Sequence, residues 1–284
     1  MSWQSQIFSL KDKIAYLKNS NEMSDVTLLV GSERKPYQAH KLLLSLFSEV
    51  FQAMFYGPMA DGAKEVALPD DDIKAIEIFL CYVYTDIVPL ESIEDGITAL
   101  YFAEKYMVLF IKNISITYLK DNITSDFVID IYEAAKSLDQ TELQIDCWEF
   151  IKQNTYDVLR NKNFKFAKFE TAMEIVCEDD LILPSELHMY NAIVEWGKEQ
   201  CNNGEQENLR QILDPLLRQV RFLTMTGLEF AGSPCEDGIL TQDEQLEIFK
   251  EMFVQNNVEN DRSERILEET KEISILQAFS TEIK

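Results

Sequence analysis

The chain has 284 residues, with 50 acidic and 26 basic side chains and a formal net charge of −24 at pH 7. A field of this sign repels nucleic-acid phosphates, so direct nucleic-acid binding is not expected. The length is sufficient for two domains with cores of their own, and a hydrophobic content of 46% with only 9 Gly and 7 Pro is typical of a compact, helix-rich protein.

The cysteines and histidines exclude the usual metal sites. Five widely spaced cysteines, an odd number, favour free and mostly buried thiols in a reducing compartment, either the cytosol or the nucleus. With only His40 and His188 and no Cys-x-x-Cys pair, we expect neither a metal nor a cofactor. No apolar run approaches the roughly 20 residues that span a bilayer, and no signal-peptide pattern opens the chain, so no membrane association is expected.

The first 120 or so residues predict a small mixed unit. Residues 9–12 predict a helix start, and Leu10, Ile14 and Leu17 then share one helical face. Residues 26–30 predict a buried strand, and residues 36–39 and 65–68 two more. Apolar spacings of three and four predict helices over residues 40–55, 73–84, 93–106 and 109–119.

The second half of the chain predicts only helices. Amphipathic segments lie near residues 127–137, 142–154, 169–177, 186–201, 209–220 and 243–253. From Val258 onward, charged residues alternate with an apolar stripe whose partner the sequence does not reveal.

No catalytic fingerprint occurs in the chain. The dinucleotide, P-loop, nucleophile-elbow and His-Glu-x-x-His patterns are all missing, so an enzyme is not expected. Structural roles are favoured over catalysis for His40 and His188. The run from Asp70 to Asp72 follows a proline, which favours a helix N-terminus over a cation site.

Five segments of the first half occur in an order and spacing shared with one known family. They read DVTLLV at residues 25–30, AHKLLLS at 39–45, FQAMF at 51–55, LPD at 68–70 and YVYTD at 82–86. Together they resemble a BTB (POZ) domain, and LRQVRFLTMTGLEF at residues 217–230 is similar to the close of a BACK domain. The resemblance implies a predominantly helical chain. Residues 1–123 would form an α+β BTB domain that begins with a dimerisation helix. Residues 124–257 would form an all-α BACK domain, and residues 258–284 an acidic amphipathic tail.

Two short segments indicate a particular subgroup of this family. The sequences SWQ at residues 2–4 and GILT at 238–241 are similar to the BTB-domain-containing subgroup that usually ends in a β-rich PHR substrate-binding domain. Nothing in the 284 residues resembles that domain. We therefore expect either the adaptor portion of a longer protein or a family member that has lost its substrate domain.

The resemblance also implies a homodimer. In this arrangement the N-terminal helix crosses to the partner subunit and its stripe of Leu10, Ile14 and Leu17 is covered there. Asp25 and Lys41 match a charged pair near the dimer interface of the family. An intramolecular pair that stabilises the corner between strand and helix is the alternative.

Many family members bind cullin-3 and recruit substrates to a ubiquitin ligase. They present a hydrophobic-x-Glu motif in the loop after the helix that here ends near Phe55, and the matching residues are Met59, Ala60 and Asp61. Aspartate keeps the charge of glutamate on a shorter side chain. Phe55 and Tyr106 lie where the family makes neighbouring cullin contacts, with core packing as the alternative for each.

The resemblance leaves two hypotheses. The first is a dimeric adaptor that joins substrate proteins of unknown identity to cullin-3, and the first BACK helices, near residues 127–151, would complete its cullin surface. The second is a scaffold outside any ligase, which dimerises and recruits other partners.

Overall fold

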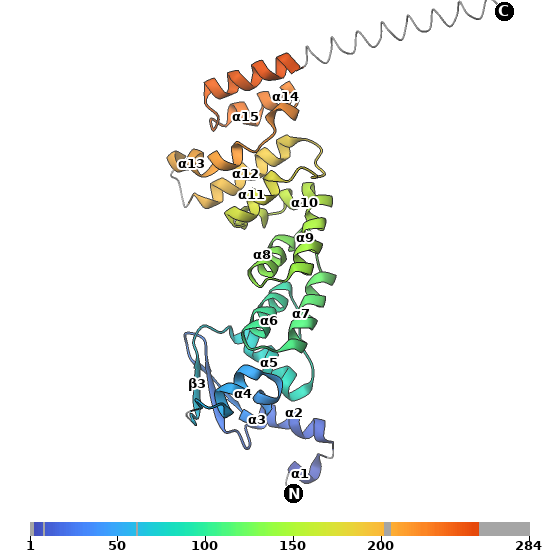
Figure 1. Ribbon diagram of the computed structural model, residues 1–284, viewed down its shortest axis with the longest axis vertical. Helices are drawn as coiled ribbons and strands as arrows, with labels where there is room; N and C mark the ends of the chain where they lie inside the picture. The colour runs from blue at the N-terminus through green and yellow to red at the C-terminus, as the bar shows by residue number, and fades with distance from the viewer. Residues whose placement is uncertain (1–2, 8, 61, 202–205, 256–284) are drawn as a thin grey trace, which may run out of the picture. The chain divides into compact units, whose positions relative to one another are not determined.

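The computed structural model describes residues 3–7, 9–60, 62–201 and 206–255 (Figure 1). Contacts divide the chain into two compact units, Met1–Gln153 and Asn154–Lys284. The border predicted between residues 123 and 124 lies within the first unit, where helices on both sides of it pack together.

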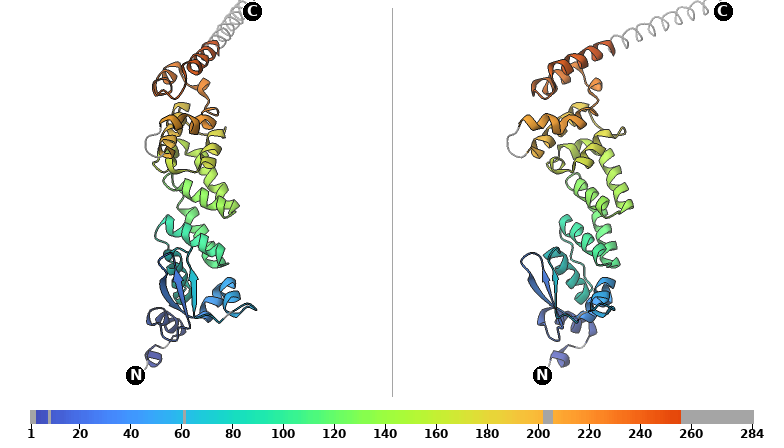
Figure 2. Two further views of the ribbon diagram at one scale, coloured as in Figure 1. Left: turned by 90° about the vertical axis from the view of Figure 1, so that its left-hand side faces the viewer. Right: turned by 60° about the vertical axis from the view of Figure 1, so that its left-hand side comes forward.

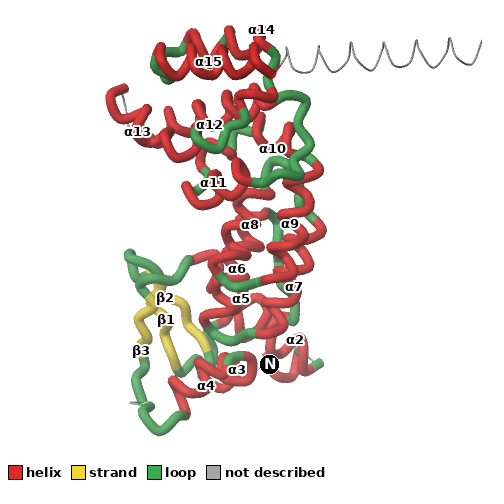
Figure 3. Tube along the Cα trace, turned by 45° about the horizontal axis from the view of Figure 1, so that its top comes forward, coloured by secondary structure: helices red, strands yellow, loops and turns green. Residues whose placement is uncertain are grey.

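The first unit contains a sheet of three strands in the order β2-β1-β3 (Figure 3). The central strand β1 (Val26–Val30) pairs antiparallel with β2 (Lys35–Ala39) and parallel with β3 (Glu65–Leu68). The strands lie side by side in both views of Figure 2. Val26, Leu28 and Val30 are buried while the residues between them are half-buried, which is the alternation that a strand with one face on a core requires. All three predicted strands are confirmed.

Helices make up the rest of this unit. The segments α1 (Trp3–Gln6) and α2 (Leu10–Ser20) precede the sheet, and α3 (Lys41–Phe47) and α4 (Glu49–Tyr56) lie between β2 and β3. The later helices are α5 (Ile73–Thr85), α6 (Ile93–Lys105), α7 (Leu109–Asp121), α8 (Val128–Ser137) and α9 (Thr141–Gln153). Buried residues of β1, β3, α5 and α6 form one continuous hydrophobic core.

The single helix predicted over residues 40–55 is wrong in one respect, because it divides at Ser48. The Ser48 side chain is buried, accepts a hydrogen bond from the amide of Phe51 (3.1 Å) and donates one to the carbonyl of Tyr106 (2.6 Å). A serine in this role caps a new helix, so α4 starts in a direction of its own. The same bond ties the start of α4 to the turn between α6 and α7.

All the regular secondary structure that is described in the second unit is helical. Its elements are α10 (Thr155–Arg160), η1 (Phe164–Phe166), α11 (Phe169–Cys177), α12 (Glu186–Gln200), α13 (Gln206–Leu217), η2 (Phe222–Thr224), α14 (Gly227–Ala231) and α15 (Ser233–Glu236), followed by a helix over residues 242–255. The helix α12 is its centre: the Trp196 indole donates to the carbonyl of Ala167 (2.8 Å) and the Tyr190 hydroxyl to Asp237 (2.5 Å). Gly197 lets α13 approach, since a Cβ there would lie 2.6 Å from Leu213.

Two further observations concern the cysteines and the length of the helices. The expectation of mostly buried thiols is wrong, because Cys147 alone of the five free cysteines is buried, while Cys177 is exposed and the others are half-buried. None of the helices in the described ranges combines the length and apolar character that a membrane span needs.

Candidate protein-interaction surface

The loop after α4 presents the most exposed large hydrophobic side chain of the described residues. The amide of Gly57 donates to the carbonyl of Ala53 (2.9 Å), and a Cβ at Gly57 would lie only 2.3 Å from that carbonyl oxygen. The helix therefore ends at a position that only glycine fills without a shift. Two residues later the side chain of Met59 is 92% exposed. Asp61, the third residue of the predicted motif, lies outside the described residues.

Phe55 lies between core and surface. Its half-buried ring stacks on Phe51 with the centroids 5.8 Å apart, and the Lys41 ammonium lies 5.5 Å from its centroid. One part of the ring packs inward while the other stays accessible. The structure thus supports both alternatives that the sequence left open for Phe55.

Tyr106 belongs to the core. Its side chain is 2% exposed and stacks on Phe51 and Phe102, with centroid distances of 4.8 and 4.4 Å. Its hydroxyl donates to Asp71 (2.7 Å), and burial, followed by this hydrogen bond, raises the pKa of Tyr106 well above its usual value. The structure supports the packing alternative for this residue, which positions its neighbours and presents no surface of its own.

Sequence reasoning missed the residues that follow Tyr106. Met107, Leu109 and Phe110 are 59%, 67% and 48% exposed at the turn into α7. Because Ser48 binds the Tyr106 carbonyl, this turn lies against the start of α4. Polar residues are the rule at a turn, so apolar residues at this predicted turn were the signal that could have indicated an exposed apolar surface.

Two of the three residues predicted for dimerisation pack against the core, and the third is exposed to solvent. Ile14 and Leu17 pack against the core of their own unit, whereas Leu10 is 74% exposed. Two leucines that the sequence did not single out, Leu42 and Leu46 of α3, are 60% and 67% exposed. Apolar side chains are thus offered to solvent by both α2 and α3.

Asp25 and Lys41 meet, but through a different contact from the one predicted. The exposed Asp25 carboxylate accepts from the backbone amide of Lys41 (2.8 Å), and the Lys41 ammonium donates to the carbonyl of Ala63 (2.6 Å). His40, the N-cap of α3, makes no side-chain capping bond, so Asp25 supplies the acceptor that the helix start needs. This contact stabilises the corner between strand and helix within one chain.

His40 and the aspartate run have structural roles. The two ring nitrogens of His40 lie 2.7 Å from the Tyr84 hydroxyl and 2.8 Å from the carbonyl of Glu22. Asp72 caps α5 by accepting from the amides of Lys74 (2.6 Å) and Ala75 (3.3 Å). The predicted helix N-terminus is confirmed.

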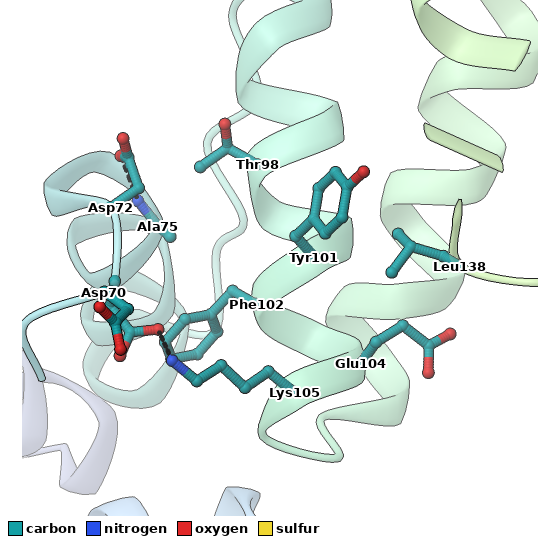
Figure 4. A pocket seen from close by; sticks show the side chains of 10 residues that line it. Asp70, Asp72, Ala75, Thr98, Tyr101, Phe102, Glu104, Lys105 and Leu138 are labelled. Atoms are coloured by element: carbon teal, nitrogen blue, oxygen red, sulfur yellow. Dashed lines mark hydrogen bonds and ion pairs between the residues drawn. The ribbon is translucent and has the colours of Figure 1, made fainter. Parts of the chain in front are cut away.

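A groove of about 600 Å³ lies beside this helix start (Figure 4). It is lined by Asp70, Asp71, Asp72, Ala75, Thr98, Tyr101, Phe102, Glu104, Lys105 and Leu138. Figure 4 shows Lys105 reaching toward the aspartates, and its ammonium lies 2.9 Å from Asp71. Within the ranges that the structure describes, no three acidic, cysteine or histidine side chains gather as metal ligands.

The first unit has the geometry of a binding module: a three-stranded sheet on a helical core, with apolar side chains exposed on α2, α3, the loop after α4 and the turn before α7. Comparison with known families agrees. Residues 15–123 match the BTB/POZ domain, and residues 128–230 match the domain described as BTB And C-terminal Kelch, or BACK. The chain therefore belongs to the BTB–BACK family, with an α+β BTB domain followed by an all-α BACK domain.

Several curated proteins with similar sequences are also named as BTB/POZ domain-containing proteins. The chain is 30% identical over 256 residues to BTB/POZ domain-containing protein 6-B of Danio rerio, an alignment that covers 87% of this chain and 52% of the relative. It is 30% identical over 254 residues to BTB/POZ domain-containing protein 6 of Mus musculus, covering 87% and 47%. It is 27% identical over 256 residues to BTB/POZ domain-containing protein 3 of Homo sapiens, covering 87% and 48%. The chain thus spans about half the length of these relatives.

Proposed function

We propose that this chain is a dimeric adaptor that binds cullin-3 and brings substrate proteins to a ubiquitin ligase. The observation that carries the proposal is the 92% exposed side chain of Met59, in the loop that directly follows α4. A flexible, polarisable methionine suits an apolar pocket on a partner. The turn that lies against the start of α4 presents Met107 and Leu109, which would extend the contact along the start of α7.

The anchoring of α4 supports the same proposal. Its first turn is fixed by Ser48, which binds Tyr106, and its last turn ends at Gly57, where a side chain would force a shift. A binding loop held between rigid elements loses less conformational freedom when a partner docks, and this favours affinity. The core residues Phe51 and Tyr106 thus act as a platform for the exposed ones.

Calorimetry of the chain with the cullin-3 N-terminal domain tests the adaptor role. We expect the wild-type chain to bind and Met59→Glu to abolish binding, because a carboxylate cannot enter an apolar pocket without a large desolvation cost. Leu228→Glu is a matched control, since Leu228 is 86% exposed in the second unit and the charge change is identical. Failure of the wild-type chain to bind cullin-3 would refute the adaptor role.

Dimerisation is proposed on separate grounds. The exposed Leu10, Leu42 and Leu46 are large apolar side chains that a second copy would cover. Light scattering should give a dimer for the wild-type chain and a monomer for Leu42→Glu combined with Leu46→Glu. A dimer without affinity for cullin-3 would favour the alternative, a scaffold that joins two copies of a partner-binding surface.

We further propose that the protein acts by binding, not catalysis, in the cytosol or nucleus. All five cysteines are free thiols, which suits a reducing compartment. The contacts of His40 engage both of its ring nitrogens, which leaves it poorly placed as a catalytic base. A hydrolytic or transfer activity that survives replacement of both histidines would contradict this proposal, and imaging of the tagged protein tests the compartment.

A further inference from the structure

The second unit contains a pocket whose charge is opposite to that of the chain. Between residues 158 and 169 there are four basic side chains and no acidic one, in a protein with 50 acidic and 26 basic residues. Three of the four, Arg160, Lys162 and Lys165, line one cavity of about 790 Å³. Such a volume is within the usual range of ligand-binding pockets, which is about 300–1,000 Å³.

The pocket is formed by α10, the segment after it and the first turns of α12. Its wall contains Tyr156 and Phe164 beside the cations, and His188 from α12. The His188 and Tyr156 rings make an edge-to-face contact at 4.8 Å, and a His188 ring nitrogen lies 3.1 Å from the carbonyl of Ser185. Aromatic packing thus holds the two sides of the pocket together.

Arg160 is positioned to bind an anion. Its guanidinium carbon lies 5.2 Å from the Tyr156 ring centroid, and one nitrogen donates to the Tyr156 hydroxyl (3.2 Å). A guanidinium has five N–H donors, so most of the donors of this exposed side chain remain for a carboxylate, which it can bind through two parallel bonds. The contact with Tyr156 also reduces the entropy that Arg160 would lose on binding.

Two glutamates beside the pocket already pair with lysines. Glu195 lines the cavity, but its carboxylate pairs with Lys198 (2.7 Å). Glu199 pairs with Lys165 (2.9 Å), so Arg160 and Lys162 are the two lining cations for which the described residues show no carboxylate partner. Arg160 lies in the last turn of α10, where a cation is favoured by the helix dipole, yet that effect does not account for Lys162 and Lys165 or for the cavity between them.

We propose that this basic pocket, lined by Arg160, Lys162 and Lys165 beside Tyr156 and His188, binds an acidic segment of a partner protein. A protein segment fits better than a nucleic acid, because the net charge of −24 repels a long phosphate backbone, whereas a single pocket holds a few carboxylates. The site depends on neither dimerisation nor cullin-3. Its chemistry would serve to recruit acidic partners to the second unit.

Fluorescence anisotropy with the full chain tests the proposal. The probe is a labelled glutamate-rich peptide, compared with a glutamine version of the same peptide and with single-stranded oligouridine. We expect the glutamate peptide to bind the wild-type chain, and Arg160→Glu combined with Lys162→Glu to weaken binding about tenfold or more through lost charge-assisted bonds. Binding should also weaken as salt rises from about 0.05 to about 0.3 M.

The matched control is Arg218→Glu combined with Lys250→Glu, which changes the net charge equally at exposed positions outside the pocket. This variant should bind nearly as well as the wild-type chain, and circular dichroism should show both variants folded. Three results would overturn the proposal: no binding of the glutamate peptide, equal loss in both variants, or stronger binding of the glutamine peptide or oligouridine.

Discussion

The hydroxyl of Tyr106 donates a hydrogen bond to Asp71 across 2.7 Å, and the Lys105 ammonium lies 2.9 Å from the other oxygen of the same carboxylate. Asp71 and Tyr106 are both buried, so the Tyr106 hydroxyl depends on this carboxylate for its hydrogen bond. This cluster joins the start of α5 to the end of α6. It also holds the turn that places Met107 and Leu109 in solvent.

Replacing Asp71 with alanine should lower the free energy of unfolding by about 1–3 kcal/mol, because the Tyr106 hydroxyl would be left buried without its acceptor. Urea unfolding measures this change. The neighbouring Asp70 is exposed, and Asp70→Ala should have little effect. Equal losses in the two variants would show that the buried hydrogen bond does not matter.

Alkaline pH should destabilise the fold through Tyr84. Burial raises the pKa of Tyr84 from 10.0 to about 12. The unfolded tyrosine ionises near pH 10 while the folded one stays neutral, so its contribution is complete below pH 10 and is lost as the pH rises toward 12. Urea unfolding at several pH values should show this decline. The decline should be smaller in Tyr84→Phe, although not abolished, because burial also raises the pKa values of Tyr106 and Tyr190.

The free thiols should react in a fixed order. Cys177 is exposed, whereas Cys147 is fully buried and its pKa is raised to about 12 by burial and by the nearby Asp146. Because the thiolate is the reactive form, iodoacetamide should label Cys177 in the native protein and Cys147 only after denaturation. Mass spectrometry of peptides reports both. Early labelling of Cys147 would mean that α9 opens readily in the native state.

Alanine at Gly57 should destabilise the protein by about 1–3 kcal/mol, since its Cβ would collide with the Ala53 carbonyl. Gly227 offers a matched comparison. A Cβ there meets no atom within 4 Å, and Gly227→Ala should be neutral or stabilising by up to about 1 kcal/mol. Thermal denaturation of the two variants measures the difference. A neutral Gly57→Ala would imply that the loop carrying Met59 adjusts freely.

Asp25→Ala should remove the cap of α3 and cost about 1 kcal/mol. If the carboxylate acts only within its own chain, this loss should not vary with protein concentration. Light scattering and urea unfolding at two protein concentrations distinguish a role within one chain from a role between subunits. A shift from dimer to monomer in the variant would instead assign Asp25 to the interface between subunits.

The strands and most helices could be predicted because their signals are local. The β-branched run at residues 26–30 and the apolar spacing of α5 depend on near neighbours alone. The division of the helix at Ser48 could not be predicted, because apolar spacing continues through Phe47 and Val50. At this position Ser48 caps α4 and is held by a hydrogen bond to Tyr106, 58 residues away.

The candidate surface was harder to predict for a related reason. A leucine on an amphipathic helix has the same pattern whether it faces the core or a partner, so Leu42 and Leu46 could not be told from Leu44, which is buried. The sequence pattern of Tyr106 is equally ambiguous, because its contact with Asp71 joins residues 35 positions apart. Met59 was singled out by the resemblance to a BTB domain, which places it in a short motif in the loop after the helix, whereas Gly57-Pro58 by itself indicates only a loop.

The strand order β2-β1-β3 also governs how the sheet can grow. At one border, β2 contains Lys35, which is charged, and Pro36, which has no amide hydrogen. Both features oppose the addition of another strand on that side. The opposite border is β3, which contains no proline, so a polypeptide that extends this sheet would add its strand there.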